Sequence, residues 1–366
     1  MRIFDGPDIC MCVSTNQRPQ PLVSVLMVAQ NSASFIHSAL LSARRQTVED
    51  IEILIVDDGS TDGTARIAQE HAIADSRVRV LPGPRRGLAA VRNVSLAEAR
   101  GRFVAILDSD DLLQADHLER LLASQQRSGA EICSSNIIMF SDDQGLQVRL
   151  FASGREWRKA RYITVEDFVR GGMIGGKNVS LGYFKPLFEV DFLRRKCIAY
   201  DPRLRIGEDF DLVMRAMLAG ARLHFTPEPS YYYRRHDFST SYRLAASDLE
   251  GLAQATRDYC TSGTALDNLF ARRLRNLEGA RRQVLALEAL RRHRVLEAFK
   301  LIAPHPEAIR LLMSSLHESM RKRTGLPSRR ELEPVGGKRR KSLFNALQLR
   351  QLAEDLAASK RSPEIS

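Results

Sequence analysis

Three acidic side chains, Asp108, Asp110 and Asp111, follow directly after an apolar run of the sequence. That run, Phe103–Leu107, predicts a strand buried on both faces of a parallel sheet, and such strands carry functional groups at their carboxyl ends. Clustered carboxylates repel one another unless a cation joins them, and oxygen ligands suit Mg2+ or Mn2+. The pattern indicates a divalent metal beside a phosphate group, although for this stretch alone a turn with Asp110 or Asp111 as helix N-cap is the better explanation.

A second acidic turn upstream favours the metal interpretation. The buried-strand pattern Ile51–Val56 ends at Asp57 and Asp58, within the turn sequence DDGSTDGT. Strand and helix patterns alternate from Leu22 to Leu107, which predicts a parallel sheet with helices on both faces. Both acidic turns then lie at the same carboxyl edge of the sheet and can share one ligand.

The first half of the chain excludes some classes of protein. Neither a GxGxxG nor a GxxxxGK[ST] motif follows the first predicted strand, so a dinucleotide fold and a P-loop NTPase are not indicated. A receiver domain also places acids at strand ends and binds Mg2+, but it does not account for the second half of the chain.

The second half contains two further polar stretches. Glu208, Asp209 and Asp211 open a predicted helix, where acids also favour the helix dipole without any functional role. The stretch Ser230–Tyr242, SYYYRRHDFSTSY, predicts one polar loop on an aromatic base. We expect Trp157, the single tryptophan, to be a structural anchor.

The composition is typical of a globular protein, and its charge indicates an anionic partner. The 366 residues are 44% hydrophobic and 27% charged, with 55 Lys and Arg against 44 Asp and Glu and a formal net charge of +11. Cations crowd into the last third, so the partner is a phospholipid, a nucleotide or a polymer. The five cysteines have no metal-ligand spacing and are expected to be reduced cytosolic thiols. No apolar run reaches the roughly 18 residues of a membrane span.

The C-terminal third predicts helices and then a basic tail. Leu, Ala and Arg recur in helical register beyond Leu244, which predicts a helical appendage and a route to a homo-oligomer. The clusters Arg321–Arg323, Arg329–Arg330 and Lys338–Lys341 suit an anionic membrane surface, at about 1 kcal/mol per cation. A solvated helix face and tail explain these clusters equally well.

In chain order, the motifs VSVLM...N, VDDGSTDGT, GLAAVRN, FVAILDSDDLL, GEDFDLVMRA and YYRRHDFSTS resemble the inverting glycosyltransferases of family 2. The resemblance covers about Leu22 to Arg243 and is closest to bacterial exopolysaccharide transferases of the succinoglycan type. It implies the GT-A fold, an α/β Rossmann-like, mostly parallel mixed sheet flanked by helices. The expected regions are a leader (1–21), a GT-A domain (22–243, with nucleotide half 22–131 and acceptor half 132–243), a helical appendage (244–320) and a basic tail (321–366).

The resemblance also implies roles for individual residues. Asp58, beside Asp57, would accept a hydrogen bond from the uracil N3–H. Asp110 would bind the metal, with Asp108 near the ribose or the metal's water shell, and Asp209 would be the catalytic base. The remaining residues expected around the donor are Arg92, Asn93, Arg234, Arg235, Ser239, Ser241 and His236, the last also as a metal ligand.

Two departures from the family pattern bear on the donor and on processivity. Many relatives place an aromatic residue before the asparagine that follows the first strand, where it stacks on uracil, but here Gln30 precedes Asn31. The QxxRW motif of processive synthases is absent after GED, which indicates transfer of one sugar per encounter.

The function that the resemblance implies is a metal-dependent inverting transferase using a UDP-sugar, with UDP-glucose expected. The expected acceptor is a growing, lipid-linked glycan, and the expected location is cytoplasmic, peripheral at the inner face of the cell membrane, with no nucleic-acid partner. A sugar-1-phosphate nucleotidyltransferase is an alternative, but it needs a glycine-rich basic loop where this chain has AQNSASF. A second alternative is a non-catalytic membrane- or nucleic-acid-binding protein with a degenerate core.

Overall fold

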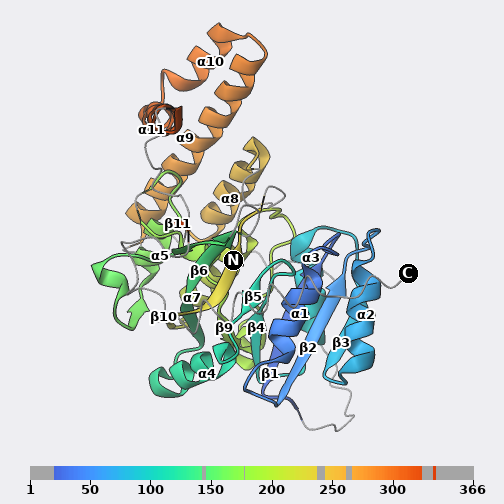
Figure 1. The fold of residues 1–366 in the computed structure, drawn as a ribbon. Coiled ribbons are helices and arrows are strands. Elements are labelled where there is room, and N and C mark those ends of the chain that lie inside the picture. The colour runs from blue at the N-terminus through green and yellow to red at the C-terminus, as the bar shows by residue number, and fades with distance from the viewer. Residues whose placement is uncertain are drawn as a thin grey trace.

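The computed structural model describes residues 20–141, 146–176, 178–236, 244–260, 266–323 and 333–334. A large mixed sheet lies at the centre with helices packed on it, and a helical arm extends from one end (Figure 1). The predicted α/β fold with a C-terminal helical appendage is confirmed.

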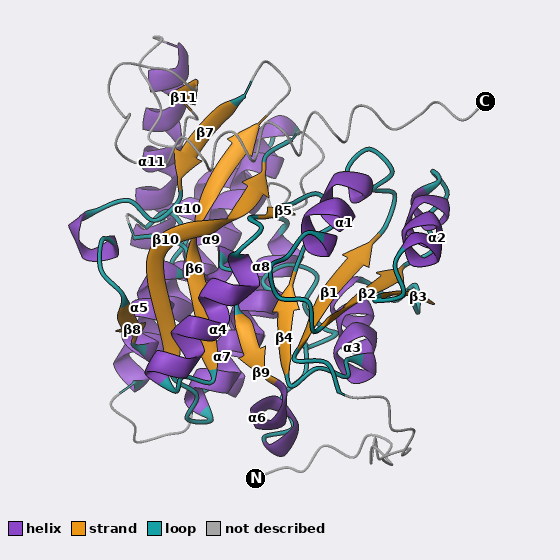
Figure 2. Cartoon of the chain, turned by 60° about the horizontal axis from the view of Figure 1, so that its bottom comes forward, coloured by secondary structure: helices purple, strands orange, loops and turns teal. Residues whose placement is uncertain are grey.

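The N-terminal half of the sheet is parallel, as the alternating pattern predicts. Its strands are β1 (Val23–Ala29), β2 (Ile51–Asp57), β3 (Val78–Pro82) and β4 (Phe103–Ile106), in the spatial order β4-β1-β2-β3. The intervening helices are α1 (Ile36–Arg44), α2 (Thr64–Ala74) and α3 (Leu88–Glu98). Figure 2 shows α1 and α2 on one face of these strands and α3 on the other. Because β1 to β4 are parallel, their carboxyl ends lie at one edge of the sheet, and both acidic turns lie there too.

The C-terminal half widens the same sheet with strands of mixed, mostly antiparallel orientation. These are β5 (Leu112–Leu113), β6 (Ile132–Ser141), β7 (Gln147–Leu150), β8 (Arg161–Ile163), β9 (Leu187–Glu189), β10 (Leu223–Arg234) and β11 (Glu333–Pro334). β9 lies antiparallel between β4 and β6, while β10 pairs with β6 in parallel and with β5 and β8 in antiparallel orientation. The helices are α4 (His117–Ser128), α5 (Val165–Gly171), α6 (Val190–Arg195) and α7 (Glu208–Leu218), with 3-10 turns at Arg155–Trp157 and Leu181–Tyr183.

The structure corrects the polar loop predicted for Ser230–Tyr242. The tyrosines Tyr231–Tyr233 belong to β10 and are buried, because aromatic side chains favour strands and these pair with β6. Only Arg235 and His236 follow the strand before residues 237–243, which lie outside the described part of the chain. Trp157 is buried against the rings of Phe184 and Phe225, in the role of an anchor.

The helical appendage is joined to the sheet domain through shared packing. It consists of α8 (Ala246–Asp258), α9 (Asp267–Arg291), α10 (Val295–Ile302) and α11 (Pro306–Arg323). Phe270 of α9 lies in the main core, and the guanidinium of Arg273 lies 4.0 Å from the ring centroid of Phe210 in α7. Tyr259 donates a hydrogen bond to Asp211. The base of the appendage is thus held on α7 by apolar, cation-π and hydrogen-bond contacts.

The helices do not suggest a membrane span. Among the described residues, no helix is both long enough and apolar enough to cross a bilayer.

We expect Phe270→Ala to lower the free energy of unfolding by about 3–5 kcal/mol, because it opens a cavity in the core that the appendage shares with the sheet. Phe270 is 1% exposed, whereas Phe299 of α10 is 69% exposed. Phe299→Ala is therefore the matched control and should change stability by no more than about 0.5 kcal/mol. Urea denaturation measures both. Equal, small changes in the two variants would contradict a shared core.

Candidate active site

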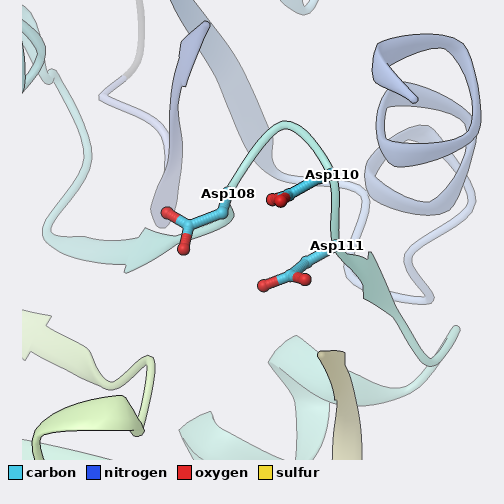
Figure 3. A group of neighbouring side chains, drawn as sticks. All are labelled: Asp108, Asp110 and Asp111. Carbon is cyan, nitrogen blue, oxygen red and sulfur yellow. The ribbon is translucent and has the colours of Figure 1, made fainter. Parts of the chain in front are cut away.

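The acidic turn between β4 and β5 gathers its carboxylates as the sequence predicts. One ligand oxygen from each of Asp108, Asp110 and Asp111 lies within 4.8 Å of the others. Figure 3 shows the side chain of Asp110 pointing across the turn toward Asp108, with Asp111 below. Helix α4 begins only at His117, after Asp116, so neither Asp110 nor Asp111 is its N-cap. The turn is therefore free for a role other than capping.

Asp111 fastens this turn to β10. Its buried carboxylate accepts hydrogen bonds from the Tyr231 hydroxyl at 2.7 Å and from the Arg234 backbone N–H at 2.8 Å. Burial, with the negative charges of Asp110 and Asp108, raises the pKa of Asp111 well above its usual range. Asp111 thus fixes the position of the turn that carries Asp108 and Asp110.

Asp110 meets His236, which lies just beyond β10. The Asp110 Oδ2 atom is 2.8 Å from the His236 Nε2 atom, and the imidazole stacks on Phe35 with 4.7 Å between ring centroids. Arg234 Nε donates a hydrogen bond to the Asp110 carbonyl oxygen at 2.8 Å. The three carboxylates of the turn offer the oxygen ligands that Mg2+ and Mn2+ prefer, and the His236 nitrogen lies at hydrogen-bond distance from one of them.

Asp108 turns toward two buried cations. Its oxygens lie 3.0 Å from Arg92 Nη2 and 2.7 Å from Lys185 Nζ. Burial opposes ionisation, but Lys185 and Arg92 outweigh it and lower the pKa of Asp108 to about 2. Asp108 is therefore a fixed negative charge at neutral pH.

Asp209 lies on the other side of the same cations. Its oxygens are 2.7 Å from Lys185 Nζ and 3.0 Å from Arg92 Nη1. Helix α7 begins after Gly207, whose φ of 84° suits glycine, and the Asp209 carboxylate binds these cations instead of capping the helix. Arg92 and Lys185 thus join the DSD turn to the GED helix.

Asp58, expected at the nucleotide, is the centre of the second acidic turn, which follows β2. Its Oδ1 atom accepts the Arg85 backbone N–H at 2.6 Å, and its carbonyl oxygen accepts Gln30 Nε2 at 3.1 Å. A Cβ on Gly83 would lie 2.6 Å from the Asp58 Oδ1 atom, so only glycine allows the loop after β3 to approach this closely. Asp57 Oδ2 accepts the Ser60 backbone N–H at 3.2 Å. Gln30 thus helps to hold Asp58 in place.

The remaining expected donor ligands lie in different settings. Asn93 exchanges two hydrogen bonds with the backbone of Tyr200, at 2.9 and 2.8 Å, so its amide holds that segment in place. The Arg234 guanidinium lies near the rings of Phe35 and Phe140. The Arg235 backbone N–H donates to the Phe140 carbonyl. Ser239 and Ser241 lie outside the described residues.

Lys185 is the site residue that the sequence did not reveal. It is buried just before β9, in the stretch YFKPLFEV. A single lysine before proline matches no motif, and its two carboxylate partners lie on distant parts of the chain. Only the position of β9 between β4 and β6 brings it to the acidic edge.

The buried carboxyl of Glu208 should make the free energy of unfolding depend on pH. Burial and the charge of Asp209 raise its pKa from 4.5 to about 7, although Arg92 and Lys185 oppose the shift. Because the folded state holds this proton more tightly, the contribution to stability is complete below pH 4.5 and is lost as the pH rises through 7.

Glu208→Gln abolishes this titration. Between pH 4.5 and 8 its free energy of unfolding should therefore fall by about 3 kcal/mol less than that of wild type. Urea denaturation at several pH values measures this difference. Glu228→Gln, the same change at an exposed position, is the control and should follow the wild-type profile. A Glu208→Gln profile parallel to wild type would show that the carboxyl titrates as it does in water.

Comparison with known proteins agrees with this geometry. Residues 24–178 match the family model "Glycosyl transferase family 2". The chain is 32% identical over 307 residues to the succinoglycan biosynthesis protein ExoO of Rhizobium meliloti, covering 82% of this chain and 87% of that protein. It is also 32% identical to ExoU of the same organism, over 64% of this chain and 68% of that protein.

Two solved structures share the fold at low identity. Staphylococcus aureus TarS 1–349, in complex with UDP-GlcNAc, aligns with a TM-score of 0.58 and 19% identity over 84% of this chain and 93% of that one. The mannosyltransferase PcManGT from Pyrobaculum calidifontis, in complex with GDP-Man and Mn2+, aligns with a TM-score of 0.53 and 17% identity over 84% of each chain. Together with its sequence relatives, these show that the chain is a glycosyltransferase with the GT-A fold and belongs to family 2.

Proposed function

We propose that this protein is a metal-dependent inverting transferase that moves one sugar, glucose, from a UDP-sugar to a growing glycan in exopolysaccharide synthesis. The observation that carries the proposal is the buried bridge of Arg92 and Lys185 between Asp108 of the acidic turn and Asp209. The relatives named for succinoglycan biosynthesis and the neighbour bound to UDP-GlcNAc support the product class and the donor class.

At the donor end, the acidic turn would meet the diphosphate through a cation. Asp110, His236 and Asp108 would hold Mg2+ or Mn2+, which as a Lewis acid offsets the charge of the departing UDP. Arg234, whose Nε donates to the Asp110 carbonyl oxygen, and Arg235, the next residue in the chain, would add positive charge toward the leaving diphosphate.

At the nucleoside end, Asp57 and Asp58 offer acceptor oxygens. The Asp57 Oδ1 atom is buried and has no hydrogen-bond partner among the described residues. Because a carboxylate can only accept, this corner favours a base edge with an N–H, as uracil has at N3. The loop after β1 holds the turn that follows Asp57 and Asp58. The Asn31 backbone N–H donates to Ser60 Oγ, and the Asn31 Oδ1 atom accepts the Thr61 backbone N–H.

At the acceptor end, Asp209 would act as the general base. It takes the proton of the acceptor hydroxyl while that oxygen attacks the anomeric carbon on the side opposite UDP, which inverts the anomeric configuration. Arg92 and Lys185 orient its carboxylate. No covalent sugar intermediate is needed.

The alternative activity has less support. A nucleotidyltransferase needs a phosphate-binding loop after the first strand, but here the loop after β1 is engaged with the loop after β2. A lipid-linked acceptor at the cytoplasmic membrane face, and peripheral attachment there through the basic tail, remain parts of the proposal. So does self-association through the C-terminal helices.

Asp110→Ala should abolish metal-dependent binding of UDP, because the diphosphate reaches the acidic edge only through the cation. Calorimetry with UDP in the presence of Mn2+, and again with EDTA, measures the loss. Asp116→Ala removes an aspartate that pairs with Arg120 just after the same turn and should leave binding intact. Unchanged binding in Asp110→Ala, or in EDTA, would rule out the metal bridge.

Asp209→Asn should slow hydrolysis of UDP-glucose by roughly 10²- to 10⁴-fold while affinity for UDP stays near wild type, because asparagine keeps the shape but cannot take a proton. Hydrolysis uses water as acceptor, so the glycan need not be known. Glu208→Gln is the control from the same motif. A larger loss in Glu208→Gln than in Asp209→Asn would assign the base to Glu208.

A further inference from the structure

Helix α10 carries apolar side chains on two faces, and only one of these faces is covered. Ala298 is buried with Ala286 and Ala289 of α9, and Leu301 and Ile302 pack against this cluster. On the other face three large apolar side chains are exposed: Val295 at 64%, Leu296 at 79% and Phe299 at 69%. An exposed apolar face on this eight-residue helix is typical of an interaction surface.

The exposed face lies at the far end of the appendage. Helix α9 carries it away from the sheet, and the turn between α9 and α10 forms the outer end of the arm (Figure 1). We call residues Leu290–Lys300 the tip. Leu290 extends the apolar surface at 42% exposure. The tip is therefore clear of the active site and can reach an external partner.

Exposed cations flank these apolar residues in the chain. The exposed basic residues of the tip are Arg291, Arg292, Arg294 and Lys300. The acidic Glu297 is 3.4 Å from Arg294, so only part of the positive charge is compensated within the tip. Long cationic side chains around exposed Leu and Phe are typical of a surface that lies in the interface of an anionic bilayer.

We propose that the tip docks the enzyme on an anionic phospholipid bilayer. Leu296 and Phe299 enter the boundary between headgroups and acyl chains, and Arg291, Arg292 and Lys300 lie at the lipid phosphates. This site is distinct from the basic tail. It rests on the proposed function only for its purpose, which is to bring the transferase to a lipid-linked acceptor.

Charge argues against the other occupants. A second copy docked tip to tip would place like cations against one another, and the basic cluster Lys338–Lys341 of the tail would be repelled in the same way. A nucleic acid would match the cations but would leave Leu296 and Phe299 in water. A lipid surface satisfies both the charge and the apolar face.

The first experiment is co-sedimentation of the full chain with vesicles of phosphatidylglycerol and phosphatidylcholine, and with phosphatidylcholine alone. Wild type should bind the anionic vesicles. Arg291→Gln combined with Arg292→Gln should weaken binding by roughly thirtyfold, at about 1 kcal/mol per cation. Leu296→Ser combined with Phe299→Ser should weaken it at least tenfold, and this loss should persist at high salt.

Two variants serve as controls for exposed apolar residues elsewhere. Ile73→Ser changes an 80% exposed side chain on α2 and should bind as wild type does. Met313→Ser combined with Leu316→Ser changes exposed residues of α11 and should also leave binding unchanged. All tip variants should retain UDP-glucose hydrolysis in solution, which keeps a failure of docking separate from a failure of the proposed chemistry.

A fluorescence experiment separates the tip from the tail. Trp157 is the single tryptophan and is buried, so Phe299→Trp adds an exposed reporter whose emission should shift to the blue on anionic vesicles. The proposal is overturned if the reporter does not shift while the protein sediments with the vesicles. It is also overturned if Leu296→Ser with Phe299→Ser binds as wild type, if only the α11 variant loses binding, or if wild type does not bind.

Discussion

Two buried cations between two carboxylates are the interaction on which the site depends. Arg92 and Lys185 each contact both Asp108 and Asp209, and the four groups come from separate parts of the chain. Removing one partner from such a cluster leaves an uncompensated buried charge, which costs about 3–5 kcal/mol. The cluster therefore fixes the acidic turn after β4 relative to the first turn of helix α7.

The sheet makes this cluster possible. The parallel strands β4 and β1 bring the acidic turn to one edge, β9 carries Lys185 alongside β4, and β10 clamps the turn from the other side. Tyr231 and the Arg234 backbone bind Asp111, while His236 meets Asp110 over Phe35.

Local patterns account for what the sequence predicted. Apolar runs followed by acidic turns marked β2 and β4, because burial and turn chemistry are encoded within a few residues. The burial of Lys185 at this site and the contacts of Asp209 with Lys185 and Arg92 were not predictable in this way, because the partners are distant in the chain. The tyrosines of β10 were misassigned to a loop, since their strand character depends on pairing with β6. Asn93 was found as a motif residue, yet its contact with Tyr200 appears only in the fold.

The most direct test of the bridge is a double-mutant cycle on Lys185→Met and Asp209→Asn, read as the rate of UDP-glucose hydrolysis at saturating donor. If Lys185 acts by orienting Asp209, the two losses overlap, and the double variant is nearly as active as the slower single variant. The coupling energy should then exceed about 0.5 kcal/mol. Losses that simply multiply would contradict the account, because they would show that Lys185 and Asp209 act independently.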